Sequence, residues 1–476
     1  MQPHYKLLIG GKWVDTREVL EVRNPFDNSV VSVVAKAGKK ELQQAVETAG
    51  KSFDKVRMLS SLKRSQILGN VSRITSEKKE QFARTISLEA GKTIRNARGE
   101  VDRAINTFSI AAEEAKRIGG EVIPLDTLHT TENVTGMTRR FPIGAIIGIT
   151  PFNFPLNLVA HKLAPAIASS NTIVLKPSST TPITALMLGE VLLEAGIPEG
   201  MVNITPCDSE LGEDLARDNR FKLLTFTGSS EVGWHLKEIS GKKRVMLELG
   251  GNAALIIHSD IDNLDYAVSR SIHGSFGYSG QTCISIQRIY LHKNIKDTFL
   301  DGLIKETKKL KMGNPLDEAT DIGPMIREDA ARKVEEWVNE ARKGGAKIIT
   351  GGKRSGSFYE PTILTNVKRD MKVHCQEVFG PVVCIYEYED FDDAIKCAND
   401  SVYGLQAGVF TQDIKRVFDV FERLEVGGVM INEVPTFRVD QMPYGGTKDS
   451  GFGREGVKYA IEEMTEMRLL VLNMRR

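Results

Sequence analysis

The sequence is poor in cysteine, with five among 476 residues, and these form neither a C-x-x-C pair nor a cluster with histidine. The odd number argues against a disulfide framework, and the spacing argues against a zinc site. The opening residues 1–13 lack the apolar core of a signal peptide, and no stretch approaches the about 20 apolar residues of a membrane span. These absences predict a cytoplasmic protein without a bound metal or a membrane partner.

An excess of charge of one sign is also absent, because 63 basic side chains are balanced by 62 acidic ones. The net charge of +1 gives no general attraction to nucleic acid or to anionic lipid. A chain of this length is too long for a single compact core. We therefore expect a soluble protein of two or more domains that does not bind nucleic acid.

From about Gly144, short apolar runs alternate with helical patterns, which predicts βαβ units and a parallel sheet covered by helices. One such helix is expected over Thr181–Ala195, because it begins with Thr-Pro and stops at Gly196. Four polar motifs follow these runs, at the sheet edge where ligands of such folds bind. They are P-F-N-F-P, K-P-S-S, F-T-G-S-S-E-V-G and E-L-G-G.

A second α/β stretch begins near Gly251, with helical patterns at Asp297–Leu310 and Glu328–Arg342. It contains Cys283, in the segment F-G-Y-S-G-Q-T-C-I-S. A free cysteine is more often a small buried hydrophobe than a nucleophile, but these glycines and hydroxyl side chains predict a thiol that a ligand can approach. The other four cysteines are interpreted as packing residues: Cys207, Cys375, Cys384 and Cys397.

The segment Ser229–Gly233 joins an apolar strand pattern to a helix pattern, and amides at such a helix start can bind a pyrophosphate. The chain lacks G-x-G-x-x-G, so this motif is also compatible with an ordinary strand-turn-helix joint. Lys176 follows another apolar strand, where it is either a cation for a ribose or phosphate or a solvated surface lysine.

Taken in order, these motifs resemble the aldehyde dehydrogenase superfamily over nearly the whole chain. The matching segments are P-F-N-F-P, K-P-S-S-x-T-P, F-T-G-S-S-E-V-G, L-E-L-G-G-N, G-Q-T-C-I-S, E-V-F-G-P-V and M-P-Y-G-G-T-K-D-S-G-F-G-R-E-G. The resemblance implies an α/β fold with a Rossmann-like cofactor domain, an α/β catalytic domain and a β-arm for oligomerisation. The expected boundaries are 1–126 and 141–249, 250–458, and 127–140 with 459–476.

The resemblance also implies an NAD(P)-dependent oxidation of an aldehyde. Cys283 is expected to attack the aldehyde carbon, while the Asn153 amide and the Cys283 N–H stabilise the resulting oxyanion. Glu248 is expected to activate the water that hydrolyses the thioester, although it is alternatively an exposed charge at a strand end. Its presence favours a free acid over transfer of the acyl group to coenzyme A, which remains the weaker interpretation.

Cofactor contacts follow from the same motifs. Lys176 and Glu377 match residues that hold ribose hydroxyls, Ser229 matches the pyrophosphate contact, and Phe379 matches the aromatic residue near the nicotinamide ribose. Strictly NAD-preferring relatives often have glutamate where this chain has Ser179, and a serine removes repulsion of a 2′-phosphate. We therefore expect NADP or NAD, with NADP accepted. The remaining cofactor candidates are Thr150, Phe152 and Gly228.

A polar substrate is predicted, because Asn153, Asn157 and His161 recur every four residues and would share one face of a helix. The alternative is a helix cap and a structural histidine. Arg438 and Arg103 are suited to a terminal carboxylate or phosphate, although either is alternatively a structural salt bridge. Our order of candidate aldehydes is lactaldehyde, succinate semialdehyde and glyceraldehyde 3-phosphate, the last oxidised without phosphorylation.

Two further expectations concern assembly and activity. Residues 128–140 match the family's protruding arm, and the apolar segment M-R-L-L-V-L-N reads as a strand with nowhere local to pair. Such a strand needs another element or another subunit to cover it, and we expect a homodimer or homotetramer. A non-catalytic binding or structural protein with the same fold is the alternative from another class. The presence of Cys283, Glu248, Asn153 and Glu377 argues against it.

Overall fold

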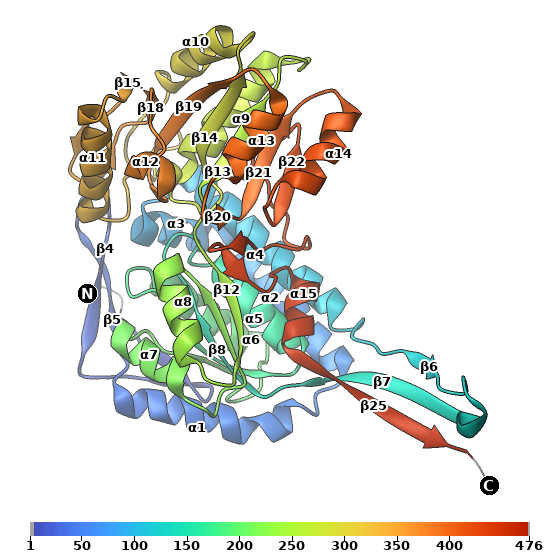
Figure 1. Cartoon of the computed structure of the whole chain (residues 1–476). Helices are drawn as coiled ribbons and strands as arrows, with labels where there is room; N and C mark the ends of the chain where they lie inside the picture. Colours follow the sequence, from blue (N-terminus) through green and yellow to red (C-terminus); the bar gives the residue numbers. More distant parts are fainter. Residues whose placement is uncertain (1–3, 475–476) are drawn as a thin grey trace.

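The computed structural model describes residues 4–474, and Figure 1 shows a body of two α/β parts from which a long β-arm projects. In the first part, the strands lie in the order β24-β12-β11-β8-β9-β10-β2-β3. Those from β12 to β10 are mutually parallel, as the sequence predicts, while β24, β2 and β3 are antiparallel to their neighbours. Their bounds are Gly451–Phe452, Arg244–Glu248, Leu223–Thr227, Ala145–Ile149, Thr172–Lys176, Val202–Ile204, Leu7–Ile9 and Lys12–Val14.

Both faces of this sheet are buried because consecutive apolar residues point to opposite sides. Ile146 contributes to a core shared with helices α2, α4, α5 and α6, whereas Ile147 contributes to a core shared with α1, α7 and α8. These helices, with α3, span Lys39–Val56 (α1), Ser61–Glu77 (α2), Lys79–Ala90 (α3), Ile94–Glu114 (α4), Asn157–Ala168 (α5), Ile183–Glu194 (α6), Ser209–Arg217 (α7) and Ser230–Ile239 (α8). The helix predicted over Thr181–Ala195 corresponds to α6.

The second part has a sheet in the order β15-β18-β19-β14-β13-β21-β22, parallel except for β15. Its strands span Lys347–Thr350, Thr362–Thr365, Val382–Tyr388, Ile286–His292, Ala253–Ile257, Gln406–Phe410 and Gly428–Ile431. Its helices are Leu264–Phe276 (α9), Lys296–Thr307 (α10), Glu328–Lys343 (α11), Lys372–Cys375 (α12), Phe391–Asn399 (α13) and Ile414–Arg423 (α14). The helices α10 and α11 confirm the two helical patterns predicted after Cys283.

The arm consists of β6 (Val122–Pro124), β7 (Val134–Pro142) and β25 (Thr465–Asn473), with a short 3₁₀ turn at His129–Thr131. The C-terminal strand has no partner nearby in the sequence, as expected, and another element covers one of its edges: β25 pairs with β7 from Thr465–Pro142 to Asn473–Val134. The two segments are distant in sequence but adjacent in the fold (Figure 1). Both faces of β25 nevertheless expose apolar side chains, with Leu469 and Val471 on one face and Leu470 and Leu472 on the other.

Short elements complete the described chain. A small sheet orders β1 (His4–Tyr5), β5 (Val30–Ala35) and β4 (Val19–Arg23), and strand pairs form between β16 (Arg354–Ser355) and β17 (Phe358–Tyr359) and between β20 (Tyr403–Gly404) and β23 (Thr447–Lys448). Helix α15 (Val457–Glu463) precedes the C-terminal strand.

Within residues 4–474 no helix has the length and apolar character needed to cross a bilayer, and no three potential ligands cluster as a metal site. The α/β fold class is confirmed, while the domain boundaries stay a prediction.

Candidate active site

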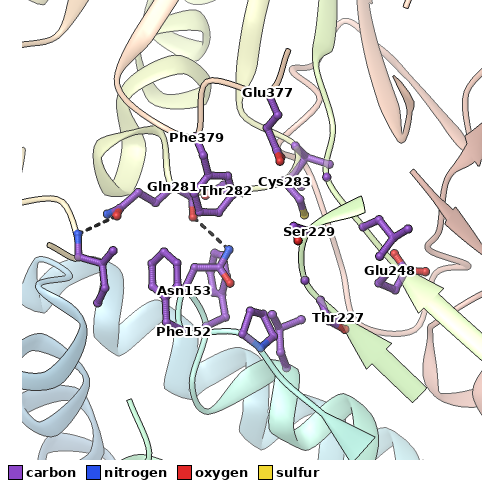
Figure 2. A pocket seen from close by; sticks show the side chains of 18 of the residues that line it. Phe152, Asn153, Thr227, Ser229, Glu248, Gln281, Thr282, Cys283, Glu377 and Phe379 are labelled. Carbon is purple, nitrogen blue, oxygen red and sulfur yellow. Dashed lines mark hydrogen bonds between the residues drawn. The ribbon is translucent and has the colours of Figure 1, made fainter. Parts of the chain in front are cut away.

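A cavity of about 490 Å³ lies where the carboxyl ends of the first sheet meet loops of the second part. Figure 2 shows that side chains from both parts point into it. Thr227 and Glu248 are the last residues of β11 and β12, so parallel strand geometry places them at this edge. The predicted residues that line the cavity are Cys283, Asn153, Glu248, Gly228, Ser229, Glu377, Phe379, Phe152, Asn157, Arg438 and Arg103.

The loop that carries Cys283 has an unusual backbone. After α9, a short turn at Gly277–Gly280 places Tyr278 and Ser279 at φ angles of 50° and 54°, a left-handed conformation that side chains disfavour. Gly280 follows at φ 69°, and a Cβ there would lie 2.1 Å from the Gly380 carbonyl oxygen. The Tyr278 hydroxyl donates to the Ala90 carbonyl and the Ser279 hydroxyl to the Gly323 carbonyl. These hydrogen bonds hold the strained turn that delivers the thiol to the cavity.

Cys283 is partly buried, with its Sγ 3.0 Å from the Tyr444 hydroxyl oxygen. Burial raises the pKa of the Cys283 thiol to about 12, while the hydrogen bond with Tyr444 and the charge of Arg438 oppose this effect. The thiol is therefore protonated at neutral pH in this state of the protein. A reaction at the sulfur requires the thiolate to be stabilised when substrate and cofactor occupy the cavity.

Asn153 lies in the turn between β8 and α5, and the helix begins only at Asn157. The prediction that Asn153, Asn157 and His161 share one helical face is therefore wrong for Asn153. Its Nδ2 atom donates to the Gln281 carbonyl at 3.1 Å, which ties it to the loop before Cys283 (Figure 2). An amide nitrogen has two hydrogens, so the second remains for a substrate oxygen. This link brings the amide and the thiol to the same end of the cavity.

Glu248 is buried, not an exposed strand-end charge. Burial raises the pKa of its carboxyl well above the ordinary value, and Glu455 adds to this effect, while Arg438 and Lys162 oppose it. Its Oε2 atom is buried and makes no hydrogen bond to the described chain. Figure 2 shows the carboxyl directed away from Cys283, so activation of a water at the sulfur requires the side chain to turn.

Behind Glu248 lies a group of buried ion pairs, of which the sequence predicted only a possible salt bridge of Arg438. Glu455 contacts Lys162 at 2.6 Å and Arg438 at 3.1 Å. Although burial favours its neutral form, Lys162 and Arg438 lower the pKa of Glu455 to about 2. Glu455 thus stays ionised, and its charge favours the protonated form of Glu248.

Asp440 organises the polar side chains predicted for the substrate. Its Oδ1 atom lies 2.8 Å from Arg103, 3.2 Å from the Asn157 amide and 3.0 Å from His161 Nε2. Arg103 and Arg438 are therefore both in ion pairs, as the structural alternative predicted, yet both also line the cavity. His161 is buried against Asp440 and does not line the cavity, and burial with repulsion from Arg438 lowers its pKa. The structural interpretation of His161 thus has direct support.

The cofactor candidates fall into two groups. Ser229 is the N-cap of α8, but its side chain does not cap the helix, which leaves the hydroxyl and the helix amides directed at the cavity. Glu377 accepts the Gly251 N–H at 2.9 Å, and burial raises its pKa to about 7. The Phe379 and Phe152 rings meet edge to face, with centroids 5.9 Å apart.

The second group, Lys176, Ser179 and Thr150, lies beyond the cavity lining near the end of β9. The Ser179 hydroxyl donates to the Cys207 carbonyl at 3.0 Å, and the Thr150 N–H donates to the Lys176 carbonyl. Lys176 is largely buried, so it is not a solvated surface lysine. Gly228 precedes Ser229 at the end of β11 and joins the first group.

Sequence reasoning missed Tyr444, Asp440, Glu455 and Lys162 as parts of the site. Tyr444 and Glu455 stand in the segment P-Y-G-G-T-K-D-S-G-F-G-R-E-G, whose glycine density marks close backbone approach. That signal identified the segment but no individual side chain. The contacts of these residues join positions far apart in the chain, so only the fold reveals them.

Comparisons with known proteins agree with this geometry. The sequence profile of the aldehyde dehydrogenase family matches residues 13–470. The chain is 48% identical over 471 residues to 3-sulfolactaldehyde dehydrogenase of Priestia megaterium, covering 99% of this chain and 98% of that one. It is 41% identical over 472 residues to lactaldehyde dehydrogenase of Methanococcus vannielii, covering 98% and 100%.

Two solved structures are similar throughout. Aldehyde dehydrogenase 21 from Physcomitrella patens, in complex with the reaction product succinate, superposes with a TM-score of 0.98 at 45% identity and covers 99% of both chains. A glyceraldehyde-3-phosphate dehydrogenase from Methanocaldococcus jannaschii, complexed with NADP, gives a TM-score of 0.92 at 40% identity, with 96% of this chain and 100% of that chain covered.

Proposed function

This chain belongs to the aldehyde dehydrogenase family, and we propose that it oxidises a short aldehyde with an anionic end to the free carboxylic acid, using NAD(P)⁺. The observation that carries the proposal is the cavity itself. It brings Cys283, Asn153 and Glu248 together with two arginines. Among anionic aldehydes, 3-sulfolactaldehyde is our first candidate, because a 48% identical relative bears that name.

The first step uses the thiolate of Cys283, which attacks the aldehyde carbon and forms a carbon–sulfur bond. The carbonyl oxygen gains the negative charge, and the Asn153 amide with the Cys283 N–H donates hydrogen bonds to it. The turn that holds Cys283 and the Asn153–Gln281 hydrogen bond fix these donors relative to the sulfur. Such preorganisation lowers the barrier because no donor has to be recruited during the reaction.

The residues around the cavity fit a nicotinamide dinucleotide. The free hydroxyl of Ser229 and the start of α8 suit a pyrophosphate, and the ionisable Glu377 and the Phe379 ring suit a ribose. When bound, NAD(P)⁺ accepts the hydride from the carbon attached to sulfur. The second group, Lys176 and Ser179, is suited to the adenosine ribose or its 2′-phosphate.

Glu248 completes the cycle. Its carboxylate takes a proton from water, the oxygen attacks the thioester carbon, and the Cys283 thiolate leaves with the sulfur–carbon bond electrons. The product is the free acid. Transfer to coenzyme A is the weaker alternative, since a buried carboxyl at this place serves hydrolysis and would destroy a thioester held for transfer.

The charged cluster that contains both arginines supports an anionic substrate. Within this cluster, the three cations Arg103, Arg438 and Lys162 pair with the two carboxylates Asp440 and Glu455. The Nε atoms of both arginines are buried and have no hydrogen-bond partner in the described chain. A buried donor without a partner costs free energy that a carboxylate or sulfonate oxygen would recover. Lactaldehyde, our first candidate from the sequence, lacks such an anion and moves behind 3-sulfolactaldehyde and succinate semialdehyde.

We expect Arg438→Met to raise KM for 3-sulfolactaldehyde by about 10-fold to 100-fold and to leave KM for neutral lactaldehyde within about 3-fold, because one charge-assisted hydrogen bond is lost. Steady-state kinetics with both aldehydes measure this. Arg98→Met is the matched control, since Arg98 lies on the same helix as Arg103 but pairs with Glu80 and Glu318 at the surface. Equal KM changes for both aldehydes would remove Arg438 from substrate binding.

We expect Ser179→Glu to lower the ratio of kcat/KM for NADP⁺ to that for NAD⁺ by about 10-fold or more, because a carboxylate repels the 2′-phosphate and accepts a hydrogen bond from a 2′-hydroxyl. Initial rates with each cofactor measure the ratio. Ser179→Ala is the control, since it removes the hydroxyl without adding charge. An unchanged ratio in Ser179→Glu refutes contact between this residue and the ribose.

The arm supports a further part of the proposal, that the enzyme assembles as a homodimer or homotetramer. The exposed apolar side chains of β25 form a surface that a second copy would cover.

The decisive experiment on function is a panel of short aldehydes followed by the absorbance of reduced nicotinamide, with each cofactor in turn. A higher kcat/KM for anionic than for neutral aldehydes supports the proposal, whereas no turnover with any aldehyde restores the non-catalytic alternative.

A further inference from the structure

Tyr444 touches the atom that reacts. Its hydroxyl oxygen lies 3.0 Å from Cys283 Sγ, within hydrogen-bonding distance for sulfur. The residue is 3% exposed and lines the cavity. Its ring packs with Ile284 and Leu405 beside the sulfur. The mechanism above assigns Tyr444 no part, although no other hydroxyl is recorded in contact with the sulfur in the described residues.

The position of Tyr444 is fixed from two sides by one residue. The Tyr444 N–H donates to the Glu455 carbonyl at 3.0 Å, and the Glu455 N–H donates back to the Tyr444 carbonyl at 2.6 Å. The Glu455 side chain in turn binds Arg438, whose guanidinium carbon lies 3.6 Å from the centroid of the Tyr444 ring. The main chain of Glu455 thus positions the Tyr444 ring, and its side chain positions the Arg438 guanidinium over that ring.

The chemistry of a buried phenol decides the direction of the hydrogen bond. Burial raises the pKa of Tyr444 well above its ordinary value, so the hydroxyl keeps its proton at neutral pH and acts as a donor, not as a base. A thiolate is an acceptor, and a donor bonded to it favours the charged form over the thiol. The cation on the ring face draws electron density from the ring and strengthens the O–H donor.

We propose that Tyr444, with Arg438 stacked on its ring, is a catalytic residue that stabilises the Cys283 thiolate by donating its hydroxyl hydrogen to the sulfur. The thiol proton passes to water in the cavity, and the Tyr444 O–H bond stays intact throughout. The hydrogen bond weakens as the sulfur bonds to the aldehyde carbon and loses its charge, and it re-forms when the thioester is hydrolysed. The proposal rests on the assignment of Cys283 as nucleophile in the proposed function.

The test is the pH dependence of alkylation of Cys283 by iodoacetamide, which needs neither aldehyde nor cofactor. The rate is followed by mass spectrometry of the peptide that contains Cys283, because other cysteines also react. In Tyr444→Phe the ring and its packing remain and only the hydroxyl is lost. Below the pKa of the thiol the rate follows the thiolate fraction, so the rate profile is expected to shift towards higher pH by about one to two pH units. At a fixed neutral pH this slows alkylation by about 10-fold to 100-fold. The acidic limb of kcat/KM should move by the same amount.

Tyr266→Phe is the matched control, since Tyr266 is a partly exposed tyrosine on α9 near Glu433 and does not line the cavity. It is expected to leave the profile unchanged. A Tyr444→Phe profile that coincides with that of the unmodified protein would falsify the proposal. If the profile shifts while no aldehyde is oxidised, the stabilisation of the thiolate by Tyr444 stands and the proposed function fails. If anionic aldehydes are oxidised but the profile is unshifted, the proposed function stands and Tyr444 is only a packing residue.

Discussion

Cys283→Ala is expected to lower kcat for aldehyde oxidation by about 10⁴-fold or more, because the proposed covalent intermediate forms on this sulfur. The loss should fall on kcat and kcat/KM equally, since the thiol acts on the reacting carbon and not on cofactor binding. The turn that holds Cys283 is anchored by Tyr278 and Ser279, so removal of the sulfur should leave the fold intact. Initial rates of reduced nicotinamide formation measure the effect, and binding of NADP⁺ by calorimetry should be unchanged.

Cys375→Ala provides the control, because Cys375 is also a partly buried free cysteine but lies at the end of α12. The kcat of this variant should stay within about 2-fold of that of the unmodified protein, because the substitution lies near the surface and breaks no buried contact. Substantial turnover in Cys283→Ala would contradict the covalent mechanism. It would leave the cavity as a site for binding or for direct hydride transfer from a hydrated aldehyde.

Glu248→Gln is the second large effect, with kcat expected to fall by about 10²-fold to 10⁴-fold because the water loses its general base. The loss should appear after the first turnover. Formation of the thiohemiacetal and loss of hydride do not use the Glu248 carboxylate, so one equivalent of reduced nicotinamide per site should form in a burst. Stopped-flow absorbance measures the burst, and mass spectrometry should find the acyl group on Cys283. An undiminished steady-state rate would contradict the role of Glu248.

The pH profile gives an independent check on the same residue. Burial, followed by the charge of Glu455, raises the pKa of the Glu248 carboxyl well above its usual range. The base works only when deprotonated, so kcat should increase with pH until the pH passes this raised pKa. In Glu248→Gln that increase should vanish. Glu340→Gln, at an exposed position on α11, should keep the profile of the unmodified protein.

The individual helices and strands of the fold could be predicted from the sequence because the patterns that indicate them involve neighbouring residues. Alternating apolar runs predicted the parallel strands, and Thr-Pro with Gly196 bounded α6 to within a few residues. The motif order indicated the family, which the match over residues 13–470 confirms. The arm shows where local signals end: the partner of β25 is β7, more than three hundred positions earlier, and no periodicity in either segment reveals that pairing.

At the site, the sequence likewise predicts which residue types are present but not which contacts they make. Asn153 was correctly expected near Cys283, but its place before α5 follows from a turn that helical spacing does not reveal. His161 has the residue type of a substrate ligand, yet Asp440, 279 positions away, takes up its hydrogen bond. Arg103 and Arg438 were candidates for a substrate or for salt bridges, and the structure shows that each has an ion pair and still reaches the cavity.

The sequence by itself determined which candidate catalytic groups this protein has: one cysteine among glycines and hydroxyls, a glutamate at a strand end and an amide in P-F-N-F-P. Only the tertiary structure decided their electrostatic setting. Burial raises the pKa of the Cys283 thiol and of the Glu248 carboxyl. Glu455 and Arg438 set the charge around these two groups, and the Tyr444 hydroxyl lies 3.0 Å from the sulfur. The physical reason is that pKa values and hydrogen bonds depend on distances and solvent exposure between residues remote in the chain, whereas motif and periodicity are properties of neighbours.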